Sequence, residues 1–138
     1  MSKRDNIHFS VKTALEKDGW TITNDPLQIP TGDTVIKIDM GAEKVLVAQK
    51  GAEKIAVEVK TLSTPSIVYA FYDAFGKYML YRDALRDEHI VRELYLAISD
   101  VAFNRIKKVD FIYKRINQYE IKVIVVDIDQ EIIKQWIK

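Results

Sequence analysis

The sequence predicts a three-layer α/β fold in which a mixed sheet is flanked by helices on both faces. Three observations lead to this class. The spacing of apolar residues alternates along the chain between the helical period of about 3.6 and the strand period of 2. The predicted strands are so apolar that helices have to cover both of their faces. The 138 residues are 48% hydrophobic, enough for one substantial core, so we expect a single domain over residues 1–138 with the element order αβββαβαβα.

The chain opens with a predicted helix and a short extended stretch. Asp5 or Asn6 can cap this helix, and Gly19 is the residue at which we expect it to end. Its apolar face is formed by residues at helical spacing, namely Ile7, Val11, Ala14 and Leu15. Trp20 then begins the extended stretch, which runs into a loop that contains two prolines.

A β-meander is predicted next, because three runs rich in β-branched residues follow one another. The runs are Val35–Asp39, Val45–Gln49 and Ile55–Lys60. A turn-like sequence at residues 50–53 separates the second run from the third. We therefore expect these runs to be neighbouring strands of one sheet.

The second half of the chain alternates between helices and strands. A long helix is predicted from Ile67 to Asp87, followed by a strand at Glu93–Ile98 and a helix from Val101 to Val109. Lys122–Asp127 has the continuous apolar character of a buried strand. Asp129 is expected to cap a terminal helix, whose apolar residues are Ile133, Trp136 and Ile137.

Three charged residues of the meander form a candidate metal centre. Glu58 and Lys60 are two positions apart, so they leave the same face of a strand, and Asp39 lies on a neighbouring run. Two carboxylates can hold Mg²⁺, with the Val59 carbonyl as a third oxygen ligand, and a lysine can position the water that attacks a phosphodiester. The candidate catalytic residues are therefore Asp39, Glu58 and Lys60. An isolated pattern of this kind is also typical of a solvated sheet face.

The strand register leaves two candidates for the first acidic ligand. In a plain hairpin, Asp39 lies opposite Glu58 only if the turn is centred between residues 48 and 49, whereas the turn-like residues centre on 51 and 52. Glu43 fits that second register better. A bend or bulge at Gly41 would return Asp39 to the site.

Composition and motifs exclude several other classes of protein. The formal net charge of +1 argues against a surface that is positive throughout, so contact with DNA would be local. The chain has no cysteine, which excludes a disulfide framework and a zinc finger and favours a cytoplasmic location. Neither a signal peptide nor a run of ~20 apolar residues is present, so we expect no membrane association. No glycine-rich phosphate loop, nucleophile elbow or HExxH motif occurs.

Sequence segments along nearly the whole chain resemble one known family. They include KDGWTIT, DPL, KIDMGAEK, KIAVEVKT, FYDAFGKYMLYRDAL and LYLAI between Lys12 and Ile98, and VIVVDID and QWIK near the C-terminus. These segments are similar to the XisH family, the excision-controlling factors of the fdxN element. The resemblance implies a restriction-endonuclease-like fold with the PD-(D/E)xK core, and it favours Asp39 over Glu43 as the first acidic ligand.

The resemblance also implies a role in programmed, site-specific DNA excision, beside a site-specific recombinase and a companion of the XisI type. The leading hypothesis is a DNA-acting accessory factor with a Mg²⁺-dependent endodeoxyribonuclease site. The alternative is a non-enzymatic interaction module whose nuclease fold has become a scaffold for those partners. A third hypothesis is a toxin-like nuclease that the companion holds inactive. The long aromatic helix favours partner contact or a homodimer over a base-stacking surface.

Four further residues are candidate auxiliary groups of the site. His8 lies one position off the apolar face of the first helix, where it can reach the metal site or remain a surface histidine, and Lys12 is one turn later. Glu43 is the alternative acidic ligand. Lys77 stands where the family usually has the glutamine of an ALGQ-like turn, and it can contact a phosphate, repel the metal or pair with a carboxylate.

Overall fold

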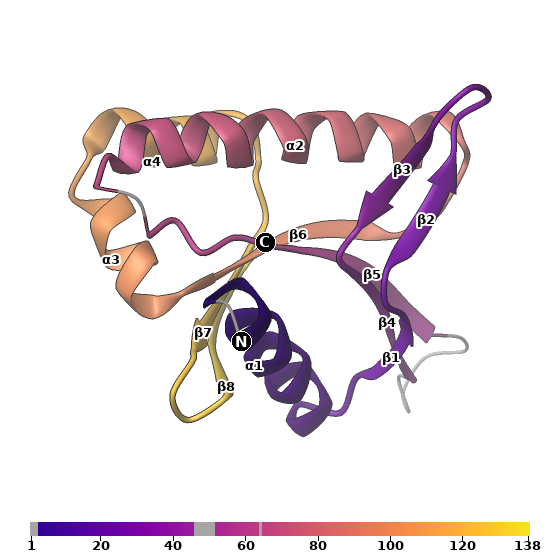
Figure 1. Ribbon diagram of the computed structural model, residues 1–138, viewed down its shortest axis with the longest axis horizontal. Coiled ribbons are helices and arrows are strands. Elements are labelled where there is room, and N and C mark those ends of the chain that lie inside the picture. Colours follow the sequence, from indigo (N-terminus) through magenta and orange to yellow (C-terminus); the bar gives the residue numbers. More distant parts are fainter. Residues whose placement is uncertain (1–2, 46–51, 64) are drawn as a thin grey trace.

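The computed structural model describes residues 3–45, 52–63 and 65–138, and it has a mixed six-stranded sheet between two helical layers (Figure 1). The first half of the chain forms α1 (Lys3–Lys17), β1 (Thr21–Asn24), β2 (Leu27–Pro30), β3 (Val35–Ile38), β4 (Met40–Val45) and β5 (Ala52–Val59). The second half forms α2 (Ile67–Asp87), β6 (Glu93–Ser99), α3 (Asp100–Lys107), α4 (Asp110–Gln118), β7 (Val123–Asp127) and β8 (Ile132–Ile137).

The large sheet has the strand order β1-β4-β5-β6-β7-β8. Strands β5, β6 and β7 are parallel, whereas β1, β4 and β8 pair antiparallel with their neighbours. Parallel neighbours need crossover connections, which are supplied by α2 between β5 and β6 and by α3 with α4 between β6 and β7. Strands β2 and β3 form a separate two-stranded sheet, inserted between two strands that are neighbours in the large sheet. The predicted meander is therefore wrong in its first run, because residues 35–38 pair with β2 and not with β4.

Each face of the large sheet has its own hydrophobic core. Figure 1 shows α1 below the sheet and α2 above it. The core on the α1 face includes Val11, Leu15, Trp20, Ile55, Val57 and Ile124. The core on the α2 face includes Ile29, Ile38, Ala56, Phe71, Leu96 and Ile106. Side chains alternate along β5 between these two cores, so Glu58, two positions after Ala56, leaves the strand on the α2 face.

Local sequence explains where several helices begin and end. The Ser66 side chain caps α2 by accepting a hydrogen bond from the Tyr69 N–H (3.4 Å), and the Ser99 side chain caps α3 in the same way through Ala102 (3.0 Å). Gly19 follows α1 with a φ of +93°, a backbone conformation that glycine adopts without strain. The expected end of the first helix is therefore confirmed.

The prediction of a three-layer α/β fold is confirmed, whereas the prediction of a terminal helix is wrong. Residues Ile132–Ile137 form β8, which pairs antiparallel with β7. Asp127 rather than Asp129 organises the turn, because its side chain accepts a hydrogen bond from the Gln130 N–H (3.0 Å). The Trp136 ring packs against Trp20 and Tyr95, with ring centroids 5.7 and 5.1 Å apart. Cross-strand pairing and this aromatic contact outweigh the helical spacing of the apolar residues.

Other boundaries also differ from expectation. Helix α1 already begins at Lys3, so neither Asp5 nor Asn6 is its cap. The two-proline loop contains strand β2, and residues 110–118 form α4, for which no element was predicted. Of the predicted strand at 45–49, only residue 45 lies within the described residues, as the end of β4. Ala52 and Glu53 belong to β5 rather than to a turn, and residues 50 and 51 lie outside the described part of the chain. None of the helices in the described ranges is both long and apolar enough to cross a membrane.

Candidate metal centre at the end of β5

Strand register brings Asp39 beside Glu58. Met40 pairs with Val57 and Val45 pairs with Ala52, and no register shift occurs between these pairs. The β4–β5 pairing is therefore centred between residues 48 and 49, which is the register that places Asp39 opposite Glu58. No bulge in β4 is needed. The neighbouring β1–β4 pair does have a register irregularity, in β1 between Ile22 and Asn24.

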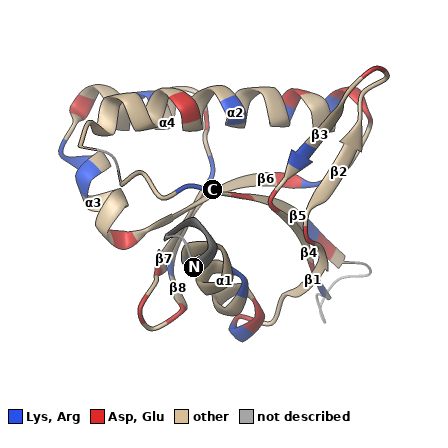
Figure 2. Cartoon of the chain, viewed as in Figure 1, with Lys and Arg blue, Asp and Glu red and all other residues tan. Residues whose placement is uncertain are grey.

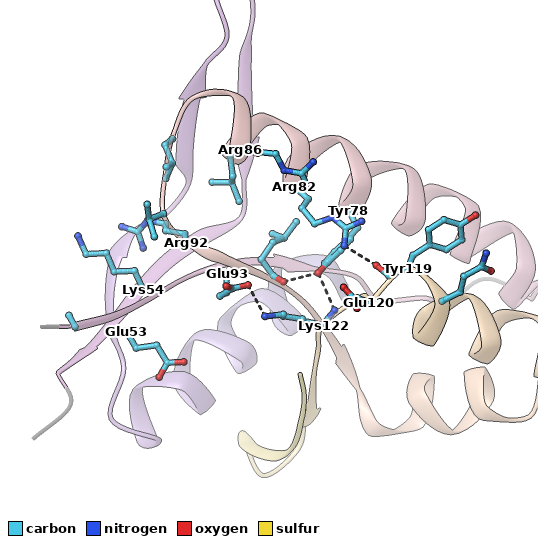
Figure 3. A pocket seen from close by; sticks show the side chains of 16 residues that line it. Glu53, Lys54, Tyr78, Arg82, Arg86, Arg92, Glu93, Tyr119, Glu120 and Lys122 are labelled. Atoms are coloured by element: carbon cyan, nitrogen blue, oxygen red, sulfur yellow. Dashed lines mark hydrogen bonds and ion pairs between the residues drawn. The ribbon is translucent and has the colours of Figure 1, made fainter. Parts of the chain in front are cut away.

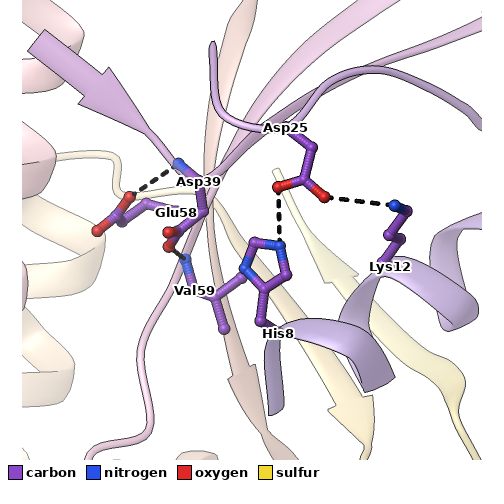
Figure 4. A network of polar contacts seen from close by, with 6 residues as sticks. All are labelled: His8, Lys12, Asp25, Asp39, Glu58 and Val59. Atoms are coloured by element: carbon purple, nitrogen blue, oxygen red, sulfur yellow. Dashed lines mark hydrogen bonds and ion pairs between the residues drawn. The ribbon is translucent and has the colours of Figure 1, made fainter. Parts of the chain in front are cut away.

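Two hydrogen bonds join Asp39 to the end of β5 (Figure 4). The Asp39 N–H donates to Oε1 of Glu58 (3.3 Å), and the Val59 N–H donates to Oδ2 of Asp39 (2.8 Å). Asp39 is the single residue between β3 and β4, and Glu58 lies one residue before the end of β5. The predicted ligands Asp39, Glu58 and Val59 are thus contiguous in space.

Glu58 is a buried carboxyl group with a strongly perturbed pKa. Its exposed fraction is 5%, and it is one of two buried polar residues among those described, with Ser10. Burial, followed by the nearby negative charge of Asp39, raises the pKa of Glu58 from 4.5 to about 8. The hydrogen bond from the Asp39 N–H and the charge of Lys60 act in the opposite direction and do not offset these effects. Two carboxyl groups are therefore held together at low exposure.

Lys60 is held by an acidic residue that the sequence did not single out. Its Nζ lies 2.6 Å from Oδ2 of Asp73 on α2, and Nζ of Lys77 lies 3.7 Å from the same oxygen. Burial alone would lower the pKa of Lys60, but the hydrogen bond and charge of Asp73, together with Lys77 and Glu58, raise it. The pKa of Lys77 is lowered, chiefly by Lys60. Of the three roles expected for Lys77, the structure shows the pairing with a carboxylate, that of Asp73.

Glu43 lies away from the centre. It pairs across the strands with Lys54, and its Oε1 lies 3.7 Å from Nζ of that lysine and 3.5 Å from Arg92. Arg92 also donates hydrogen bonds to the carbonyls of Ala42 (3.3 Å) and Ile55 (3.0 Å). Glu43 thus belongs to an ion-pair cluster near the start of β5, whereas Asp39 takes the position opposite Glu58.

His8 and Lys12 meet at Asp25, a residue that sequence analysis did not select. Nε2 of His8 lies 3.0 Å from one carboxylate oxygen of Asp25, and Nζ of Lys12 lies 3.3 Å from the other (Figure 4). Both residues come from α1, which covers the face of the sheet opposite to the one that carries Glu58. They form a neighbouring network on the α1 side.

The donors at the end of β5 fit a hard cation in their chemistry. The Asp39 and Glu58 carboxylates are the oxygen ligands that Mg²⁺ and Mn²⁺ accept, and Mg²⁺ commonly binds through one or two carboxylates with water in the remaining positions. Within the described ranges, no group of three or more His, Cys, Asp or Glu side chains is placed to hold a metal ion. A bound cation would therefore need the Val59 carbonyl, water or substrate oxygens as further ligands.

A hollow lies at the end of the parallel strands that is opposite to Asp39 and Glu58 (Figure 3). It has a volume of about 1320 Å³ and is lined by the beginnings of β5 and β6 and the end of α2. Its charged side chains are largely engaged with one another or with the backbone. Nζ of Lys122 lies 2.7 Å from Glu93, and Nη1 of Arg82 donates to the Tyr119 carbonyl (2.8 Å). Asp39 and Glu58 do not line this hollow, because they lie at the other end of β5.

Comparison with known proteins gives consistent results over almost the whole chain. A family model described as XisH protein matches residues 1–134. The crystal structure of an XisH family protein from Nostoc punctiforme is 41% identical, has a TM-score of 0.86 and covers 97% of this chain and 100% of that chain. The crystal structure of an fdxN element excision controlling factor protein from Anabaena variabilis is also 41% identical, with a TM-score of 0.86, and covers 98% and 100%. No curated protein matches the chain.

Proposed function

The chain belongs to the XisH family, and from this membership we propose that it controls the excision of a genetic element as a DNA-acting factor with a Mg²⁺-dependent nuclease site. The excision role follows from the related factor in Anabaena variabilis. The nuclease site is argued from the residues at the end of β5. The DNA, the XisI-type companion and the site-specific recombinase are the partners that this role requires.

The observation that carries the nuclease proposal is the buried carboxyl group of Glu58 beside the half-buried carboxyl group of Asp39. A buried carboxyl group next to a second carboxyl group destabilises the fold whenever both are ionised, unless a positive charge compensates them. The ammonium of Lys60, whose charge acts on Glu58, is engaged by Asp73. Groups whose pKa is shifted by both burial and a specific charged neighbour are concentrated at functional sites. A divalent cation bound to both carboxylates would stabilise their ionised forms.

The division of roles follows from the positions of the side chains. Asp39 and Glu58 would bind the cation, with the Val59 carbonyl as a third oxygen, and Lys60 would hold the attacking water against the scissile phosphate. The cation supplies charge neutralisation and a lower pKa for bound water. Asp73 fixes the Lys60 ammonium on the α2 side of the site. The succession α1, β1, β4, β5, α2 and β6 supports assignment to the restriction-endonuclease-like superfamily, with β2 and β3 as an insertion.

A calorimetric titration with Mn²⁺ and Mg²⁺ tests this proposal. The parent protein is compared with Glu58→Gln and Asp39→Asn, which remove one ligand charge each, and with Glu43→Gln as the matched control. We expect binding by the parent and by Glu43→Gln, and loss of binding in the other two variants. Cleavage of duplex, nicked and branched DNA is then measured for the same four proteins. A Glu58→Gln protein that binds metal and cuts DNA at the parental rate would sink the assignment.

A second candidate function is a non-enzymatic scaffold for the XisI-type companion and the recombinase. The observation that favours it is the short contact between Lys60 and Asp73, because it holds the lysine in an ion pair. This function predicts tight association with the companion in the presence of EDTA. The Glu58→Gln variant would then associate as well as the parent does, and neither would bind metal. Failure of the purified companion to bind the parent at micromolar concentration would reject the scaffold.

A further inference from the structure

A second, smaller hollow adjoins the candidate centre. It has a volume of about 490 Å³ and lies between the segment after β5 and the first turns of α2. Its described lining includes Lys60, Leu62, Pro65, Tyr69, Ala70 and Asp73. Lys60 and Asp73 therefore belong to both the hollow and the candidate centre. Any molecule that occupies the hollow lies beside the group assigned to the attacking water.

The aromatic residues of α2 divide between its two sides. Phe71 and Tyr78 are buried in the core, whereas the exposed fractions of Tyr69 and Tyr72 are 73% and 60%. The Tyr69 and Tyr72 rings contact each other in a T-shaped arrangement, with centroids 5.7 Å apart. Tyr69 lines the hollow, and Tyr72 supports it from the next turn. The helix thus presents a large, supported aromatic ring to solvent at the entrance of the hollow.

Part of the lining of the hollow, from the segment after β5, is preformed. Arg105 on α3 donates hydrogen bonds to the carbonyls of Leu62 (3.0 Å) and Pro65 (3.2 Å), which ties the segment after β5 to the body of the protein. The Leu62 side chain is only 4% exposed. Leu62 and Pro65 are therefore held by contacts that do not depend on a ligand, so little ordering of this part of the lining is needed when a flat group enters.

The charges around the hollow favour an anionic molecule. Lys60 and Lys77 both contact Asp73, so two ammonium groups share one carboxylate at this point of α2. Elsewhere the positive and negative residues are interspersed over the chain, as Figure 2 shows, and the formal net charge is only +1. Two ammonium groups beside an apolar, aromatic hollow are a combination that suits a nucleotide, with its phosphate and its flat base.

We propose that this hollow receives an unpaired nucleobase of the DNA, stacked on Tyr69, while the adjoining phosphate lies at the Asp39–Glu58 centre. The inference rests on the proposed function and specifies its substrate class. A base can leave the stack and enter such a hollow only where the strand is single or distorted, because unpairing a duplex base costs a few kcal/mol. The preferred substrate is therefore DNA with an unpaired segment, such as a single-stranded tail or a junction, rather than an intact duplex.

The test measures DNA binding separately from cleavage. A duplex and the same duplex with a single-stranded tail are titrated with the protein by fluorescence anisotropy, with Ca²⁺ replacing Mg²⁺ and again with EDTA. Tyr69→Leu keeps an apolar side chain but removes the stacking face, Tyr69→Phe keeps that face, and Phe111→Ala is the matched control. Phe111 is likewise exposed, at 63%, but lies on α4. A 2-aminopurine in the tail reports stacking through quenching of its fluorescence.

We expect the parent to prefer the tailed DNA and to quench 2-aminopurine. Tyr69→Leu should weaken binding to the tail by about 5- to 100-fold, the range expected for the loss of one stacked base, and leave duplex binding unchanged. Tyr69→Phe and Phe111→Ala should retain the parental affinity. Equal affinity of the parent for both DNAs, or an unchanged tail affinity in Tyr69→Leu, overturns the proposal. If Tyr69→Leu instead loses only the XisI-type companion, the hollow is a protein-docking surface and the proposal is also overturned.

The outcomes separate this inference from the nuclease proposal. Metal binding that depends on Glu58, with cleavage unaffected by Tyr69→Leu, would leave the nuclease in place and reject the nucleobase hollow. Quenching that depends on Tyr69, without metal binding or cleavage, would support the hollow as a DNA-binding site and reject the nuclease. Because Tyr69 is largely exposed, its variants should unfold at the parental urea concentration, which checks that they are folded.

Discussion

The raised pKa of Glu58 makes a quantitative prediction about how the stability of the fold depends on pH. In the unfolded chain this carboxyl has its ordinary pKa of 4.5, whereas in the folded protein the pKa is about 8. Between these two values the unfolded chain has lost the proton and the folded protein still holds it. The unfolded state therefore binds fewer protons, and the free energy of unfolding falls as pH rises through this window. Below pH 4.5 and above pH 8 this group adds no further slope.

The magnitude follows from the difference between the two pKa values. A difference of 8 − 4.5, about 3.5, corresponds to about 5 kcal/mol at 1.36 kcal/mol for each unit of pKa. About 3.5 kcal/mol of that change falls between pH 5 and pH 8, because the titration at each end is gradual. Single domains are stabilised by roughly 5–15 kcal/mol in total, so the effect is large enough to measure in a urea titration.

The assay is equilibrium unfolding in urea at pH 5, 6.5 and 8 in the presence of EDTA, for the parent and for Glu58→Gln. Glutamine has nearly the same shape and remains neutral, so the variant should gain about 3.5 kcal/mol relative to the parent between pH 5 and pH 8. Adding Mg²⁺ at pH 8 should stabilise the parent and leave the variant unchanged, because the cation binds the ionised carboxylate. Parallel curves for the two proteins across the whole pH range would refute the reasoning.

Three further predictions concern other parts of the structure. Tyr78→Phe removes the buried hydroxyl that donates to the carbonyl of Leu94 (2.9 Å) and accepts from the N–H of Lys122 (3.0 Å), just before β7. The variant should lower the free energy of unfolding, measured in urea, by about 1–3 kcal/mol, and no loss would contradict this prediction. Leu15→Ala removes a fully buried side chain of the α1 core and should cost about 2–5 kcal/mol, whereas a cost below 1 kcal/mol would mean that α1 packs loosely. Asp73→Asn should cost less than about 1 kcal/mol, because Asp73 is 59% exposed, yet reduce DNA cleavage roughly 10- to 100-fold by releasing Lys60. Its metal affinity, measured by calorimetry, should stay parental, and an unchanged cleavage rate would remove Asp73 from its positioning role.

The long helix could be predicted because all of its local signals agree. Ser66 supplies the cap, and the apolar residues recur at helical spacing, so α2 has the predicted bounds Ile67–Asp87. The final strand gave conflicting signals. Ile133, Trp136 and Ile137 fit a helical face as well as they fit an irregular edge strand, and only pairing with β7 decides between them. Tertiary contacts of this kind leave no periodic trace in the sequence.

The acidic ligand shows how far register can be predicted. Whether Asp39 is predicted to lie opposite Glu58 depends on where the connection between β4 and β5 is assumed to be centred. The turn-like lysine-glycine sequence placed that centre too late in the chain. Because Ala52 already lies in the strand, the plain register returns Asp39 to Glu58, and Glu43 pairs with Lys54 instead. The family resemblance favoured Asp39, the residue that lies opposite Glu58, although the local reasoning from turn residues favoured Glu43.

Asp25 and Asp73 were missed for a different reason. Each contacts its partner only after folding, Asp25 from the segment after β1 and Asp73 from the exposed side of α2. An aspartate in a loop or on a helix surface is ordinary in any sequence. The one usable signal was the spacing of four between Asp73 and Lys77, which places both on one helix face.

The position of Asp39 between two sheets has a mechanical consequence. The hairpin of β2 and β3 packs on α2 through Ile29 and Ile38, and the chain passes from it into the large sheet through Asp39 alone. Asp39 therefore connects the two sheets. The position of its carboxylate depends on how the hairpin packs against α2, the helix that carries Asp73. The distance between Asp39 and the Lys60–Asp73 ion pair therefore depends on the apolar contacts of Ile29 and Ile38 with α2. Substitutions at those apolar contacts can change the geometry of the candidate metal centre while every charged residue stays the same.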